Sequence, residues 1–234
     1  MTLQSARERA RSDVRAEILR VTREHLAREG AGSLSLRAVA RDLGLVSASA
    51  IYRYFDNRDS LLTALIIESY DALGAATEAT LVTTRRQPPR ERWVAAARAI
   101  RQWAVANPHE YALLYGSPIP GYAAPDDTVG PGTRASLALL QIVRDAHHDG
   151  LLCAPVAVEA AGDIAPAVDH DLELLRDAIA LEYPAPTVLA TLLAWTQLFG
   201  LVSFEVFGQT KGVVHDHAAF FDAAATTMGA AIGL

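Results

Sequence analysis

The chain has 234 residues, of which 51% are hydrophobic, so it can bury a sizeable core without disulfides or metals to hold it together. Cys153 is its only cysteine, which excludes an internal disulfide and favours a reducing compartment. The first residues have no apolar run typical of a signal peptide, and no apolar stretch reaches about 20 residues without polar interruption. We therefore expect a cytoplasmic protein without a membrane partner.

Charge is distributed unevenly along the chain. Residues 1–60 contain 11 basic and 8 acidic residues, a net charge of +3, whereas the remainder contains 10 and 19, a net charge of −9. A basic part in an acidic chain suggests a nucleic-acid or membrane partner for that part. The signal becomes useful only if the arginines share one face.

The first elements in chain order are short helices separated by glycines. Residues 13–29 show the 3.6-residue period of an amphipathic helix, and Gly30 follows its last turn. Ser33 or Ser35 is positioned to cap a second helix that ends near Gly44.

A third helix is expected over residues 46–54, and a long fourth helix is expected to begin near Arg58. Two helices, a tight glycine turn and a further short helix form the layout of a helix-turn-helix unit. Strand signals are nearly absent. The sequence therefore predicts an all-α fold with a three-helix DNA-binding domain over residues 1–60 and a helical domain over 61–234.

The second domain is also expected to be helical. Residues 116–133 contain four glycines and four prolines and are expected to be a non-helical loop, either a lid or a plain connection. The expected helices lie at 92–106, near 108–115, and at 134–149, 167–182, 187–208 and 215–232.

The residues after Gly44 have the composition of a DNA-contacting helix. Ser47 and Ser49 are small enough to allow close approach to bases or phosphates, and Ala48 could touch a thymine methyl group. Hydroxyl and guanidinium groups suited to phosphate oxygens follow on Tyr52, Tyr54, Arg37, Arg53 and Arg58. The alternative is that these aromatic residues belong to the core and the arginines to a solvated face.

The stretch SLSLRAVARDLGLVSASAIYRYFDNRDSLL resembles the DNA-binding domain of the TetR (tetracycline repressor) family of bacterial transcriptional regulators. Ser35 stands where the family has Ser or Thr opening its second helix, residues 40–46 form the turn, and residues 52–55 form the aromatic run. Tyr54 and Arg58 stand where His and Lys are common. The resemblance covers residues 13–62 and implies that Ser35 joins the DNA-contacting set.

The second half resembles the C-terminal ligand-binding domain of a TetR subgroup marked by a Trp and a Gly in its penultimate long helix. Trp195 and Gly200 would fill those places. The resemblance implies a small-molecule effector, a homodimer and a near-palindromic operator DNA. The predicted function is a ligand-responsive regulator, most simply a repressor released by its effector. The alternative is an all-helical small-molecule binding protein or enzyme without DNA binding.

Residues 188–207 are apolar nearly all round, so a helix there must be covered on nearly all sides. A central position in a monomer would do this, but we favour a homodimer through the last two helices. Aromatic residues near the loop or on this helix are candidates for a ligand site, with ordinary core positions as the alternative. They are Trp103, Tyr111, Tyr115, Tyr122, Trp195 and Phe199.

No metal site or cofactor is expected. His147 and His148 are adjacent, and His215 and His217 are two apart, whereas a single helix chelates a metal with i, i+4 spacing. Cys153 lacks an activating motif, and no phosphate-binding or nucleophile motif is present. An enzymatic function is therefore not predicted.

Overall fold

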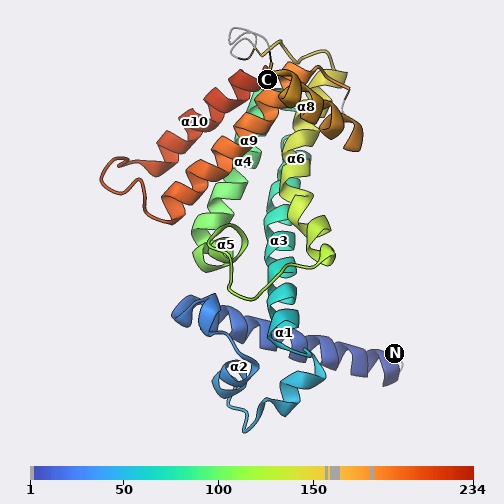
Figure 1. Cartoon of the computed structure of the whole chain (residues 1–234), viewed down its shortest axis with the longest axis vertical. Coiled ribbons are helices and arrows are strands. Elements are labelled where there is room, and N and C mark those ends of the chain that lie inside the picture. The colour runs from blue at the N-terminus through green and yellow to red at the C-terminus, as the bar shows by residue number, and fades with distance from the viewer. Residues whose placement is uncertain (1–2, 156–157, 159–163, 180–181) are drawn as a thin grey trace. The chain divides into compact units, whose positions relative to one another are not determined.

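The computed structural model describes residues 3–155, 158, 164–179 and 182–234, and all regular elements within these ranges are helices (Figure 1). The α-helices are α1 (Leu3–Glu29), α2 (Leu36–Asp42), α3 (Arg58–Thr83), α4 (Pro89–Ala106), α5 (Pro108–Tyr115), α6 (Val129–His148), α8 (Pro166–Ala178), α9 (Ala185–Val206) and α10 (His217–Ile232). Short 3-10 helices are η1 (Ala31–Ser33), η2 (Ala48–Arg53) and η3 (Asp126–Thr128). The predicted all-α fold is confirmed.

The chain forms two compact units. The N-terminal unit comprises Met1–Ala72 together with Asn107–Gly132, and the C-terminal unit comprises Leu73–Ala106 together with Thr133–Leu234. The predicted boundary at 60/61 falls in the first turn of α3, whereas the units divide at 72/73 within the same helix. The continuous helix places its first half in one unit and its second half in the other.

The core of the N-terminal unit draws buried side chains from α1, α2, η2 and α3. Leu19 of α1, Val39 of α2, Ile51 of η2 and Leu61 of α3 are fully buried. Partly buried apolar side chains between residues 107 and 132 pack against the same cluster; they are Leu113, Ile119 and Tyr122. Residues 107–132 therefore belong to this unit because their side chains complete its core.

In the C-terminal unit, α4 packs against α9 and α10, which also pack against each other (Figure 1). Trp93 and Ile100 of α4 are fully buried, as is Leu198 of α9. A two-contact ion pair links α4 to α9, in which the Arg101 guanidinium donates to the Glu205 carboxylate at 2.6 and 2.7 Å. Both side chains of this pair are largely buried.

Two predicted elements need correction. Helix α1 begins at Leu3, ten residues before the predicted start. The predicted loop 116–133 ends earlier than expected, because η3 covers Asp126–Thr128 and α6 begins at Val129. Pro131 lies in the first turn of α6, where backbone N–H groups have no intrahelical acceptor and a proline is tolerated.

The remaining helices match the prediction within a few residues. The segment predicted as a helix over 46–54 is the 3-10 helix η2, over 48–53. Helices α8, α9 and α10 correspond to the predictions at 167–182, 187–208 and 215–232. Residues 180–181, within the first of these predictions, lie outside the described residues.

Candidate nucleic-acid interface and effector cavity

The turn between α2 and η2 is built by local hydrogen bonds. The Ser35 side chain caps α2 by accepting from the Ala38 N–H at 3.1 Å. At the other end, the Gly44 and Leu45 N–H groups donate to the Arg41 and Ala40 carbonyls, both at 2.9 Å. Gly44 has φ +72°, a left-handed conformation that side chains rarely adopt, so the glycine makes this tight turn possible.

Small side chains open η2 on the molecular surface. The Ser47 side chain caps η2, and its hydroxyl oxygen lies 2.7 Å from that of Ser49. Both serines are exposed. Ala48 is half-buried and packs against the core, so only part of its surface is open to a thymine methyl group. Ser47 and Ser49 face solvent more fully than Ala48 does.

Some of the aromatic and basic side chains of α2 and η2 are exposed, and others pack against the core. Tyr52 is 53% exposed, and Arg37 and Arg53 are exposed. Tyr54 is half-buried and packs against the core cluster. Tyr52, Arg37 and Arg53 thus offer a hydroxyl and two positive charges to a polyanion.

Arg58, predicted to contact phosphate, binds the protein's own backbone through its guanidinium. Arg58 Nε donates to the Leu34 carbonyl at 3.0 Å, and Nη2 donates to the Ala31 carbonyl at 3.1 Å. These bonds join the start of α3 to the segment between α1 and α2. The Arg58 side chain therefore supports the helix-turn-helix from within.

Two arginines outside the predicted set lie beside η2. Arg7 and Arg11 of α1 line a surface hollow of about 430 Å³ together with Arg53 and Tyr54. No acidic residue lines the hollow. Both arginines lie within the predicted domain 1–60 but precede the predicted first helix at 13–29, so they were not among the predicted DNA-contacting residues.

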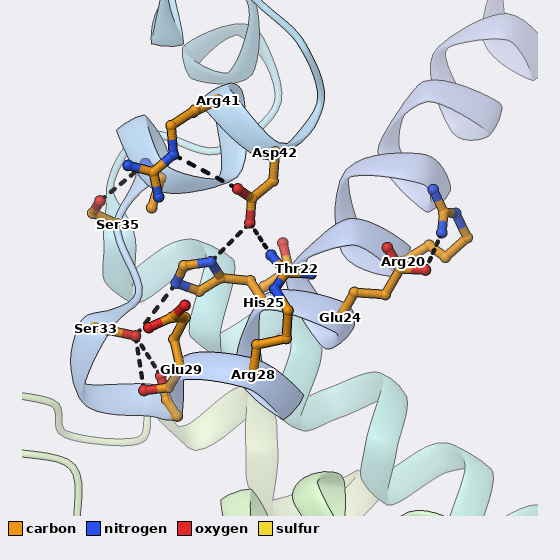
Figure 2. A network of polar contacts seen from close by, with 12 residues as sticks. Arg20, Thr22, Glu24, His25, Arg28, Glu29, Ser33, Ser35, Arg41 and Asp42 are labelled. Atoms are coloured by element: carbon orange, nitrogen blue, oxygen red, sulfur yellow. Dashed lines mark hydrogen bonds and ion pairs between the residues drawn. The ribbon is translucent and has the colours of Figure 1, made fainter.

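A buried polar network connects α1 to α2 (Figure 2). His25, whose side chain is 2% exposed, contacts Asp42 through Nδ1 at 2.9 Å and Ser33 through Nε2 at 3.3 Å. Arg28 also donates to Asp42. The hydrogen bond with His25, with Arg28 nearby, holds the pKa of the Asp42 carboxyl below its ordinary value. The network therefore fixes the α2 end next to the glycine turn.

Three predicted ligand residues belong to the N-terminal unit. The rings of Tyr111 and Tyr115 lie 4.9 Å apart, and Tyr70 of α3 contacts Tyr115 at 6.1 Å. The Tyr122 hydroxyl lies 3.0 Å from that of Thr63. The structure places all three predicted residues around α3 and α5 of this unit, with Tyr111 fully buried.

The C-terminal unit contains an apolar cavity of about 240 Å³ between α4, α6, α8 and α9. Of the six predicted ligand residues, Trp195 lines it, and its indole N–H donates to the Ser136 hydroxyl at 2.9 Å. Phe199 contacts Trp195 at 5.9 Å between ring centroids without lining the cavity. Trp103 is half-buried on α4, also outside the lining. Sequence reasoning missed Trp93 and Tyr183, which line the cavity and are fully buried.

Helices α9 and α10 expose large apolar side chains. Leu193, Phe204 and Phe207 are 47%, 57% and 43% exposed, and Phe220 of α10 is 47% exposed. A side chain added at Gly200 would meet no atom within 4 Å. We call this surface the α9–α10 face. Helix α9 is also long and apolar enough to cross a membrane by length and composition.

Within the described residues, no three His, Cys, Asp or Glu side chains are grouped to hold a metal ion. His148 Nδ1 instead contacts the Asp149 carboxylate at 3.2 Å, and the Asp216 side chain caps α10. These acidic residues thus serve local contacts at helix ends.

Comparisons with known proteins agree with this layout. Residues 18–65 match the family described as bacterial regulatory proteins of the tetR family, and residues 93–228 match the tetracyclin repressor-like C-terminal domain. The HTH-type transcriptional regulator Rv1816 of Mycobacterium tuberculosis is 39% identical over 220 residues, covering 93% of this chain and 91% of that protein. The chain belongs to the TetR family of bacterial transcriptional regulators.

Solved structures extend this comparison. The crystal structure of regulatory protein SCO4313 has a TM-score of 0.74 and 32% identity, covering 94% of this chain and 97% of that one. A TetR family transcription regulator from Marinobacter aquaeolei VT8, at 18% identity and TM-score 0.62, shares the fold over 95% of this chain and 97% of that one. The TetR-family protein is thus a DNA-binding transcriptional regulator of a non-enzymatic class. One helix of this length and composition is weak evidence for a membrane span, because a core helix of a soluble protein meets the same criteria.

Proposed function

We propose that this TetR-family protein is a cytoplasmic homodimer that represses transcription and leaves its operator when a small molecule binds the C-terminal unit. The observation that carries the proposal is the exposed surface beyond Gly44, formed by Ser47, Ser49, Tyr52 and Arg53. A short helix with small residues at its start and polar groups behind it suits the major groove.

The DNA-contacting set is revised by the geometry. Arg37 and Arg53 are proposed to bind phosphates, and Arg7 and Arg11 extend the same basic surface along α1. Arg58 is proposed as a positioning residue because two backbone carbonyls accept its hydrogen bonds. Ser35 and Tyr54 keep a structural role, as a helix cap and a core contact, beside any contact with DNA.

The second subunit is proposed to cover the α9–α10 face. Its apolar side chains are exposed in a single chain, and Gly200 leaves room for a neighbouring helix. Two copies related by a two-fold axis would bury this face against itself. They would also present two reading heads to half-sites about 34–36 Å apart on a near-palindromic operator.

Release by an effector requires that the ligand bind the DNA-free form of the dimer more tightly than the DNA-bound form. The cavity in the C-terminal unit is the proposed effector site because its lining consists mainly of apolar side chains of α4, α6, α8 and α9.

A gel-shift titration with duplex DNA from upstream of the protein's own gene tests the proposal. Specific retention is expected, with affinity that falls steeply as salt rises because phosphate contacts release counterions. Replacing Ser49 with Trp should abolish specific retention, whereas Val213→Trp, in an exposed loop far along the chain, should leave it unchanged. Equal retention of random duplex DNA would contradict operator recognition. A reporter gene placed behind the same DNA distinguishes repression from activation.

A further inference from the structure

The cavity between α4, α6, α8 and α9 has an unusual lining for its size. Leu139 and Leu140 of α6 and Val188 of α9 supply aliphatic surface, and Trp93, Tyr183 and Trp195 supply aromatic surface. No charged residue lines it. A charged ligand placed there would lose its hydration without gaining a counter-charge.

Two arginines near the lining in sequence donate to other parts of the protein. Arg92 donates to the Asp145 carboxylate at 2.5 Å, next to Trp93. Arg144 Nη2 donates to the Ile179 carbonyl at 2.7 Å. The Nε groups of Arg92, Arg144 and Arg176 have no hydrogen-bond partner in the described part of the chain, but none of these arginines lines the cavity. An ionised ligand would therefore have no counter-charge in contact with it.

Two lining residues carry buried polar atoms for which the described part of the chain supplies no hydrogen-bond partner. They are the Trp93 indole nitrogen and the Tyr183 hydroxyl. A side chain built at Gly229 would lie 3.1 Å from Trp93 Cδ1, beside the indole nitrogen, so this edge of Trp93 abuts α10. Tyr183 lies between this cavity and a second hollow lined by Arg144 and Asp145, and its O–H can rotate about the C–O bond to meet an acceptor.

Burial raises the pKa of Tyr183 to about 12, so its hydroxyl keeps its proton at neutral pH and remains a donor. Buried donors normally have an acceptor, and a ligand oxygen would provide one. The volume of the cavity limits the size of the ligand. A cavity of about 150 Å³ holds benzene, and sites for drug-sized ligands begin near 300 Å³, so about 240 Å³ suits one substituted ring.

We propose that this cavity binds an uncharged, largely apolar molecule of about the size of a substituted benzene, whose oxygen accepts a hydrogen bond from the Tyr183 hydroxyl. That this molecule is the effector rests on the proposed function, whereas its binding to the cavity does not.

The test is calorimetric titration of the full chain, without DNA, with four probes of one ring each. Methyl benzoate is neutral with an acceptor, propylbenzene is neutral without one, benzoate is an anion and benzylamine is a cation. Methyl benzoate should bind at least tenfold more tightly than either ion and severalfold more tightly than propylbenzene. Binding of an ion as tight as that of the ester, or no binding by any probe, would overturn the proposal.

Three variants test whether the probes bind in this cavity and whether the Tyr183 hydroxyl is the hydrogen-bond donor. Tyr183→Phe should lower the affinity for methyl benzoate to that for propylbenzene. Tyr122→Phe, the same change in the N-terminal unit, should change the affinity for neither probe. Leu192→Trp fills the cavity from a partly exposed position and should abolish binding of both neutral probes. Thermal unfolding confirms that each variant is folded. Unchanged ester affinity in Tyr183→Phe would remove the acceptor requirement and with it the proposal.

A separate experiment tests the effector role by adding methyl benzoate to the complex of the protein with operator DNA. Binding to the free protein without release of DNA would leave the ligand class intact and contradict regulation through this cavity. Release of DNA by a compound that does not bind the cavity would contradict the effector site and not the operator-binding function.

Discussion

At the scale of single residues, position in the fold decides between contact with DNA and support for the reading head. Arg53 and Arg58 are five residues apart and chemically identical, yet Arg53 is exposed and Arg58 binds two backbone carbonyls. A phosphate contact requires a side chain whose donors are still available. The sequence pattern identifies both arginines as basic residues of the segment but does not separate these roles.

Alanine substitutions at Arg53 and Arg58 test these two roles. Arg53→Ala should reduce the slope of log affinity against log salt by about one, because one phosphate contact is lost. Arg58→Ala should leave the slope unchanged and lower the free energy of unfolding by about 2 kcal/mol, through loss of two charge-assisted bonds. Salt titrations of operator binding and urea denaturation measure both quantities. A reduced slope for Arg58→Ala would return it to the contacting set.

The Asp42 carboxyl should make the stability of the protein sensitive to acid. Its folded pKa lies below its unfolded value near 3.9, so its contribution is present in full above about pH 5 and is lost as pH falls through the folded pKa. Asp42→Asn should lower the unfolding free energy at pH 7 and remove this part of the acid dependence. The measurement is urea denaturation between pH 3 and 7. Parallel pH profiles for the two proteins would show that Asp42 contributes nothing through its charge.

At the scale of elements, helix α4 is held by ion pairs of very different burial. Arg101 and Glu205 are 16% and 14% exposed, whereas Arg98 and Asp222, which link α4 to α10, are 50% and 39% exposed. Breaking a buried pair leaves an uncompensated charge, whereas solvent screens an exposed one. The α4–α9 contact is therefore the one sensitive to substitution.

Arg101→Ala should lower the free energy of unfolding by about 3 kcal/mol, because the Glu205 charge stays buried without its partner. Arg98→Ala is the matched control and should cost less than about 1 kcal/mol. Equilibrium denaturation in urea compares the two variants. Equal losses would mean that burial does not distinguish these pairs.

Most element positions follow from the sequence, because apolar period, serine caps and Gly44 are local signals. The start of α1 at Leu3 was missed because residues 3–12 lack the apolar period that identifies a helix. The start of α6 at Val129 was missed because Gly130 and Pro131 normally indicate a loop, although a first helical turn accommodates them. The cavity lining could not be predicted, because Trp93 and Tyr183 are 90 residues apart and meet only through tertiary packing.

At the scale of the whole molecule, we propose that assembly depends on the α9–α10 face. Phe204 is 57% exposed in a single chain, more than expected for a phenylalanine in a central helix of a soluble regulator. A second copy of the chain would remove this side chain from water. Dimerisation is typical of the family, and we propose that it occurs through these exposed residues.

Phe204→Glu should convert the dimer into a monomer, because a carboxylate would be buried at the two-fold interface. Operator affinity should fall by at least tenfold, because a monomer contacts only one half-site. Val213→Glu, also at an exposed apolar position, should change neither property. Sedimentation equilibrium and gel shift measure the two outcomes. A native protein that sediments as a monomer would contradict this interface.

The N-terminal unit is assembled from two stretches of chain, with residues 107–132 returning to complete its core. A fragment that ends at Ala72 would therefore expose the surface that Leu113, Ile119 and Tyr122 normally cover, and we expect it to aggregate. Hybrid regulators made by exchanging reading heads between family members would inherit the same difficulty. A functional exchange should transplant both stretches together, so that each head keeps the side chains with which it folds.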